Sequence, residues 1–210
     1  HSGKNVKVRV HPLSVNSNDN NNSHCNGVRN GIVFQTPNEN IPASYEYVSS
    51  TSFCTTLRGR NDYVQTVEHL LAALYICNIQ NAVVEINGTE LPILDGSCKP
   101  YCDAFENNRT FMETNDDRDI KTLKILKPIN VTLDDCHATF LPNNNDESGL
   151  TISVDVNFEQ FSLPRNKIEF NDKMFLKEVS PARTFTFESV VKQLKSNGLI
   201  KGGNLDNAIV

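Results

Sequence analysis

Two adjacent residues, Glu68 and His69, are the strongest candidates for chemistry in this chain of 210 residues. Glu68 is the only formal charge in the segment Tyr63–Cys77, which we expect to form a helix. At about 100° per residue, the large apolar side chains of this helix share one face, and His69 points roughly the opposite way. That opposite face carries Gln65 and two alanines instead of the Lys and Glu typical of a solvated surface. We therefore expect it to be covered too, with Glu68 and His69 where two layers meet.

A carboxylate beside an imidazole is the pairing that a hydrolytic zinc site uses. Three protein ligands hold the metal, a water takes the fourth position, and a nearby carboxylate removes a proton from that water. A carboxylate withdrawn from solvent is a stronger base than an exposed one. The alternative is purely structural, with His69 as a hydrogen-bonded interior histidine and Glu68 as a tolerated carboxylate at the helix edge. The pair alone does not decide between these interpretations.

The segments around this helix show the patterns of a mixed fold. Asp62 and the Gln three residues later resemble a capping box, which predicts that the helix begins here. Alternating apolar residues predict a strand near Val6–Val10 and another over Asn81–Asn87. After the second strand, Ser97 is expected to cap a short helix that runs to about residue 111.

A second group of patterned segments follows the charged stretch Glu113–Arg118, which is typical of a linker. An Asn cluster at 143–145 is expected to close a hairpin between strands at 136–141 and 150–158. Further along, a helix is predicted to end at Gly198, because a residue without a Cβ suits the left-handed cap.

The composition is that of an ordinary globular chain and argues against some classes of function. A net charge of −5 and a pI near 5.5 argue against nucleic acid as a partner, because such proteins need a surplus of Lys and Arg. No apolar run approaches the length that crosses a bilayer. The six cysteines include no Cys-x-x-Cys pair, and we interpret them as reduced thiols. The chain begins with His1 and shows no signal peptide, so we expect a missing N-terminal start and a cytoplasmic location, or an organelle if the source is eukaryotic.

Five motifs, in order along nearly the whole chain, resemble those of the UDP-3-O-acyl-N-acetylglucosamine deacetylases of lipid A biosynthesis. They are His1–Gly3, Thr66–Leu70, Leu91–Ser97, Ala182–Phe185 and Gly198–Val210. One short motif would be weak, but five in the same order are highly specific. The resemblance implies a zinc-dependent hydrolase that removes acetate from a UDP-linked 3-O-acylated N-acetylglucosamine.

The resemblance also implies roles for individual residues. His69 matches the first zinc ligand, and Glu68 matches the general base that activates water. Thr184 matches the hydroxyl that helps stabilise the oxyanion formed on the acetamide, and Phe185 matches an aromatic that packs on the substrate sugar. Asp95 has two interpretations, either a carboxylate that supports a metal ligand or simply the turn-forming residue of Asp-Gly.

Two further groups of residues match positions that contact substrate. Phe53, Cys54 and Thr55 match a segment beside the active site, which predicts that Cys54 is a partly exposed thiol. A stretch at about residues 183–210 resembles the insert that forms a passage for the substrate's acyl chain. Its expected lining residues are Val191, Ile200, Gly203, Ala208 and Val210.

The departures from the family pattern are equally specific. In the family, the other two zinc ligands come from a His-Lys-x-x-Asp motif and a further His acts as general acid, and none of these residues lies in this chain. We therefore expect a fragment that lacks the C-terminal third and is inactive by itself. Thr186 stands where the family often has Gly.

By the same resemblance we predict an α+β fold with two similar domains, each a mixed β-sheet with helices packed on one face. The first would span 1–117 and carry the Glu-His helix. The second, 118–210, would be incomplete and would carry the acyl-passage insert. We also expect a monomer. The alternative function is a non-catalytic paralogue that binds an acylated sugar nucleotide without hydrolysing it.

Overall fold

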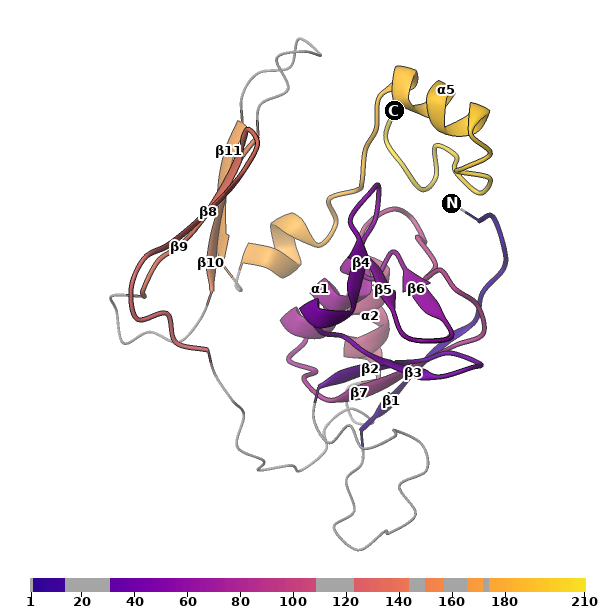
Figure 1. Cartoon of the computed structure of the whole chain (residues 1–210), viewed down its shortest axis with the longest axis horizontal. Coiled ribbons are helices and arrows are strands. Elements are labelled where there is room, and N and C mark those ends of the chain that lie inside the picture. The colour runs from indigo at the N-terminus through magenta and orange to yellow at the C-terminus, as the bar shows by residue number, and fades with distance from the viewer. Residues whose placement is uncertain (1, 14–30, 109–122, 144–149, 157–165, 172–173) are drawn as a thin grey trace, which may run out of the picture. The chain divides into compact units, whose positions relative to one another are not determined.

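The computed structural model describes residues 2–13, 31–108, 123–143, 150–156, 166–171 and 174–210 (Figure 1). The chain contacts divide it into two compact units, one formed by His1–Thr114 with Lys173–Val210 and the other by Asn115–Asp172. Several small sheets and few helices make the chain α+β, as predicted. None of the helices in the described part is long and apolar enough to cross a membrane.

A four-stranded mixed sheet forms the base of the first unit. Its strands lie in the order β1-β7-β2-β3, with β7 antiparallel to β1 and parallel to β2. Their bounds are Val8–Pro12 for β1, Ala82–Ile86 for β7, Ile32–Gln35 for β2 and Asn40–Pro42 for β3. The strands expected near residues 6–10 and 81–87 are therefore confirmed, with small shifts at their ends.

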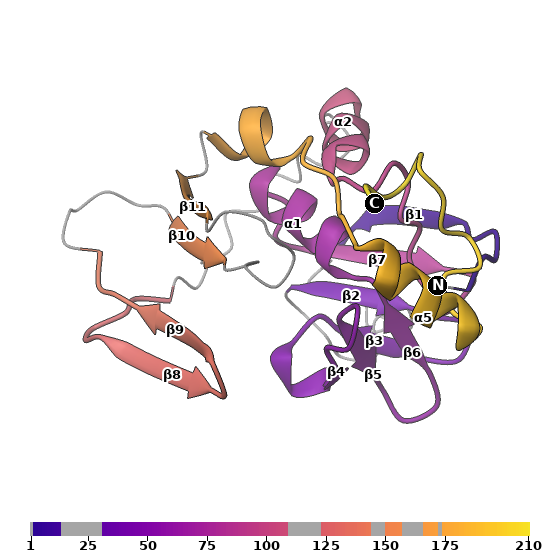
Figure 2. The ribbon, with the colours of Figure 1, turned by 90° about the horizontal axis from the view of Figure 1, so that it is seen from above.

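Two helices lie on the same side of this sheet (Figure 2). Helix α1 spans Glu68–Ile76 and helix α2 spans Lys99–Asn107. Their buried side chains join those of the sheet in one apolar core, in which Phe34 of β2 and Val84 of β7 are fully buried. On the face expected to be covered as well, Ala73 is fully buried, whereas His69 and Ala72 are half-buried, so this face of α1 is only partly covered.

A second, antiparallel sheet corrects the predicted start of α1. It consists of β4 (Val48–Ser50), β5 (Thr56–Arg58) and β6 (Tyr63–Gln65), and a short 3-10 turn at Tyr45–Tyr47 precedes it. Residues 63–65 thus pair with β5 instead of opening the helix, and the Asp62 carboxylate accepts the N–H of Tyr63 (2.9 Å). The prediction of a helix from Asp62 is wrong, because pairing between strands overrides the local pattern.

The start of α2 is close to the prediction. The Ser97 hydroxyl accepts the backbone N–H of Lys99 (3.2 Å), so it satisfies one of the free donors at the helix start. The helix ends at Asn107, earlier than expected. Among the described cysteines, all five are free thiols, and Cys102 of this helix is a core residue.

The C-terminal part of the first unit contains a π-helical turn, Phe175–Val179, and helix α5, Glu188–Ser196. Gly198 follows α5 with a left-handed φ of 72°, as predicted. The chain then turns back, and Ile209 forms a single parallel bridge with Phe185.

The second unit contains two antiparallel strand pairs. Strand β8 (Ile129–Leu133) pairs with β9 (Cys136–Phe140), and β10 (Thr151–Val156) pairs with β11 (Asn166–Asn171). The strands at 136–141 and 150–158 were expected to pair with each other, and this prediction is wrong. A two-residue turn with Asp134 at a φ of 49° lets β8 and β9 pair locally instead.

The predicted division of the chain at 117/118 remains a prediction. In the structure, Lys173–Val210 clusters with the first unit. The expected linker at 113–118 lies outside the described residues. The monomeric state also remains a prediction.

Candidate active site

A pocket of about 630 Å³ opens in the first unit. Its wall has a polar part, which includes Glu68, His69 and Thr184. It also has an apolar part, contributed by α5 and the residues after it. The pocket therefore suits a ligand that carries both polar and hydrocarbon groups.

Glu68 reaches this pocket because the chain turns sharply between β6 and α1. Thr66 occupies the left-handed region at a φ of 60°, and its N–H donates to the carbonyl of Thr55 (3.1 Å). The half-buried Glu68 carboxylate in turn accepts the N–H of Thr55, with Oε2 and N 3.1 Å apart. A backbone amide thus orients the candidate base.

His69 lies next to Glu68 and is half-buried at the pocket wall. Burial lowers the pKa of His69 below its usual 6.5, against the negative charges of Glu68 and Asp95, which act to raise it. The neutral imidazole is therefore favoured near neutral pH. This is the form of histidine that binds a metal ion.

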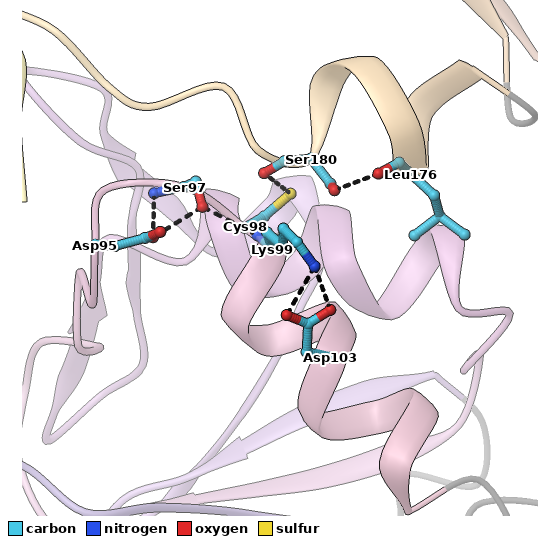
Figure 3. Close-up of polar contacts among 7 residues, drawn as sticks. All are labelled: Asp95, Ser97, Cys98, Lys99, Asp103, Leu176 and Ser180. Atoms are coloured by element: carbon cyan, nitrogen blue, oxygen red, sulfur yellow. Dashed lines mark hydrogen bonds and ion pairs between the residues drawn. The ribbon is translucent and has the colours of Figure 1, made fainter.

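Asp95 is a turn-forming residue, which is one of its two predicted interpretations; support of a metal ligand remains a prediction. It lies in a turn in which the N–H of Gly96 donates to the carbonyl of Ile93 (2.9 Å), and its carboxylate accepts the N–H and the hydroxyl of Ser97 (2.9 and 2.8 Å) (Figure 3). Burial alone would raise the pKa of Asp95, but the bonds from Ser97 and the charge of Arg183 outweigh it and hold the pKa below the usual value. The carboxylate stays ionised, and its charge acts on His69.

Thr184 is held in the pocket wall by its backbone. Its N–H donates to the carbonyl of Gly96 (2.7 Å), and its carbonyl accepts the N–H of Ile209 (3.0 Å). Gly96 has a φ of 88°, and a Cβ at this position would collide with the carbonyl oxygen of Asn207. Three chain segments therefore meet at a position that requires glycine.

With this geometry established, comparison with known proteins decides the family. The family of UDP-3-O-acyl N-acetylglycosamine deacetylases matches the chain over residues 1–210. The chain belongs to this family.

Curated relatives support the assignment to the deacetylase family. Proteins named UDP-3-O-acyl-N-acetylglucosamine deacetylase are 37% identical over 218 residues in Legionella pneumophila (strain Corby), 34% over 218 in Teredinibacter turnerae and 33% over 214 in Stenotrophomonas maltophilia (strain R551-3). Each alignment covers 100% of this chain and 65% of the relative. The chain therefore spans about 65% of the length of these deacetylases.

The structure of this deacetylase family member brings most of the predicted site residues together. The pocket is lined by Phe53, Glu68, His69, Thr184, Phe185, Val191, Ile200, Gly203, Ala208 and Val210. The roles assigned to these residues by resemblance remain predictions. Phe185 is 48% exposed and meets Phe187 edge to face, with ring centroids 6.0 Å apart.

Cys54 and Thr55 lie beside the pocket without lining it. Cys54 is only 7% exposed, so the expectation of a partly exposed thiol is wrong. Phe53 has a left-handed φ of 63° and is 64% exposed, and the following Cys54 is turned inward. Thr55 contributes through its backbone N–H, which the sequence comparison did not predict.

Glu90 and Thr66 are among the pocket residues to which the sequence reasoning gave no role. Glu90 is 8% exposed and accepts the backbone N–H of Ser2 (2.7 Å), which ties the N-terminal segment to the pocket wall. Its signal was present, because Glu90 is the only charge between Asn87 and Leu94. The second is Thr66, whose buried Oγ1 has no hydrogen-bond partner among the described residues. Thr66 has a left-handed backbone, which β-branched residues rarely adopt, so its residue type did not predict this conformation.

His69 fits one position in a zinc site, because it is a neutral imidazole at the wall of a partly polar pocket. The described residues do not provide a complete set of zinc ligands. Within them, no group of three or more His, Cys, Asp or Glu side chains is placed to hold a metal ion.

Proposed function

We propose that the whole protein is a zinc-dependent amide hydrolase that removes acetate from UDP-3-O-acyl-N-acetylglucosamine in lipid A biosynthesis. The main support is that Glu68, His69 and Thr184 line one pocket in a chain of the deacetylase family. The names of the curated relatives supply the substrate. The acylated sugar nucleotide also matches a pocket with both polar and apolar walls.

We propose that His69 supplies one ligand to the zinc ion and that residues outside this chain supply the others, so the chain alone is predicted to be inactive. When bound, zinc supplies a Lewis acid that activates water and polarises the acetamide. Asp95 would keep a negative charge near the imidazole and strengthen its interaction with a cation.

The chain's own residues would handle the proton and the developing charge. Glu68, oriented by the Thr55 N–H, would accept the proton of the attacking water. The Thr184 hydroxyl would donate a hydrogen bond to the acetamide oxygen as it becomes negative. Phe185, with its ring partly exposed, would pack on the sugar.

The apolar wall would bind the acyl chain. It includes Val191, Ile200 and Ala208, which lie in the stretch predicted to form the passage. Burial of hydrocarbon here would contribute roughly 0.8 kcal/mol for each methylene withdrawn from water.

The test is acetate release by the whole protein from UDP-3-O-acyl-N-acetylglucosamine, together with calorimetric binding. We expect release that stops after zinc chelation and returns when zinc is added back. Normal release after complete chelation would contradict the metal's role. Tight binding without release, even in the zinc-loaded protein, would support the alternative of a non-catalytic paralogue.

A further inference from the structure

Arg183 directly precedes the pocket residue Thr184 and links two separate segments of the chain through its side chain. Its Nε donates to the backbone carbonyl of Asp95 (2.6 Å), and its Nη2 donates to the backbone carbonyl of Leu205 (2.8 Å). The half-buried Arg183 therefore joins the turn at Asp95 to the segment that contains the pocket residue Leu205. The planar fork of arginine can make both bonds at once, whereas the ammonium of lysine is a single point of charge.

Backbone hydrogen bonds of the next residue, Thr184, link the same two segments. Thr184, which directly follows Arg183, donates its N–H to Gly96 and accepts the N–H of Ile209. Leu205 and Ala208 both line the pocket. A shift of the 205–209 segment would therefore be transmitted to the backbone that places the Thr184 hydroxyl.

The geometry points to Arg183 as a positioning residue that makes turnover depend on the acyl chain. This inference rests on the proposed deacetylase function. Binding of the acyl chain would restrict the motion of the 205–209 segment. Through its two hydrogen bonds, Arg183 would then also restrict the motion of Thr184 and of the Asp95 turn. Binding energy from a remote part of the substrate would then raise the rate constant of the chemical step, and not only the affinity.

The main experiment compares two substrates in the zinc-loaded whole protein. One is UDP-3-O-acyl-N-acetylglucosamine with a long acyl chain, and the other is UDP-N-acetylglucosamine, which has none. For Arg183→Lys we expect kcat with the acylated substrate to fall about tenfold to a hundredfold, the loss that corresponds to one hydrogen bond from a charged donor. With the unacylated substrate, kcat should change by no more than about twofold, since the coupling is not used.

Arg58→Lys is the matched control. Arg58 carries the same charge and lies over the Tyr63 ring, 4.8 Å from its centroid, away from the pocket. This variant should leave kcat unchanged for both substrates. An equal loss for both substrates in Arg183→Lys would mean a merely structural role and would overturn the inference, as would no loss for either.

A second measurement needs no substitution and holds if Arg183→Lys fails to fold. In zinc-free wild-type protein, the acylated nucleotide should slow amide hydrogen exchange at Thr184 and Ile209 about threefold more than the unacylated nucleotide does. Equal slowing would overturn the inference. If zinc-loaded wild-type protein releases no acetate from either substrate, the proposed function fails and this inference fails with it; an active wild type with an unchanged substrate ratio in Arg183→Lys overturns only the role of Arg183.

Discussion

The Glu68 carboxylate accepts a hydrogen bond from the backbone N–H of Thr55, with Oε2 and N 3.1 Å apart. The two residues meet because β5 and β6 pair and because Thr66 turns the chain sharply into α1. The candidate base is therefore oriented by the main chain and does not depend on the side chain at position 55.

This relationship predicts different results for two substitutions at one position. In the whole protein, Thr55→Ala should keep deacetylation within about twofold, because the N–H donor remains. Thr55→Pro removes that donor and should lower kcat about tenfold to a hundredfold. Steady-state kinetics test this, with thermal unfolding of both variants to detect a folding defect. Equal activity of two folded variants would contradict the orienting role of the amide.

The Thr184 hydroxyl should act on catalysis with little effect on stability. Its backbone bonds to Gly96 and Ile209 do not involve the side chain. Thr184→Val, which keeps the shape, should lower kcat about 100- to 1000-fold if the hydroxyl stabilises the oxyanion. Thr184→Ser should recover most of the rate. Comparable rates for the valine and serine variants would rule out a role for the hydroxyl.

Gly96 should not tolerate a side chain, and Gly198 is its matched control. Both have a left-handed φ, but a Cβ at Gly198 would meet no atom within 4 Å, whereas one at Gly96 would collide with Asn207. Gly198→Ala should lower the free energy of unfolding by about 1 to 2 kcal/mol, the cost of the left-handed backbone. Gly96→Ala should lower it by about 1 to 3 kcal/mol more, from the collision. Urea unfolding of both variants measures the difference, and equal losses would contradict the close approach.

Glu39 should give part of the stability a dependence on pH. Its carboxylate accepts the backbone N–H groups of Arg60, Asn61 and Asp62 (3.1, 2.8 and 2.7 Å) in the turn between β5 and β6. Burial alone would raise the pKa of Glu39, but these three bonds outweigh it and hold the pKa below the usual 4.5. The unfolded state therefore binds the proton more readily, so this contribution is present above pH 4.5 and is lost as the pH falls through the folded-state pKa.

Glu39→Gln tests this contribution. Because water competes at this largely accessible site, we expect the variant to be less stable by about 1 kcal/mol at neutral pH. The difference from wild type should shrink at a pH well below 4.5, where both side chains are neutral. A difference that stays constant across this range, measured by urea unfolding, would contradict the assignment.

Particular residues show what the sequence could predict and what it could not. The alternating valines of β1, the apolar residues of β7 and the glycine after α5 carry local signals that survive in the fold. Residues 63–65 fit both a helix and a strand, and their pairing with β5, which apolar periodicity does not show, decides between the two. Local periodicity alone therefore placed the start of α1 too early.

In the candidate site, too, the sequence predicted some features and missed others. The family motifs predicted the pocket residues Glu68, His69 and Thr184, because residue type and order carry that signal. The Thr55 amide and the Arg183 bonds to two carbonyls involve main-chain atoms, whose positions no residue type encodes. The inward turn of Cys54 depends on the backbone of its neighbour, and was missed for the same reason.

The most direct test of the account is the rate of acetate release by zinc-loaded whole protein and its Glu68→Gln variant. Glutamine can still accept the Thr55 N–H but cannot take up a proton. We predict a kcat at least about 100-fold lower for the variant, with substrate affinity and unfolding free energy close to wild type. Near-normal acetate release by Glu68→Gln would contradict the assignment of Glu68 as the base.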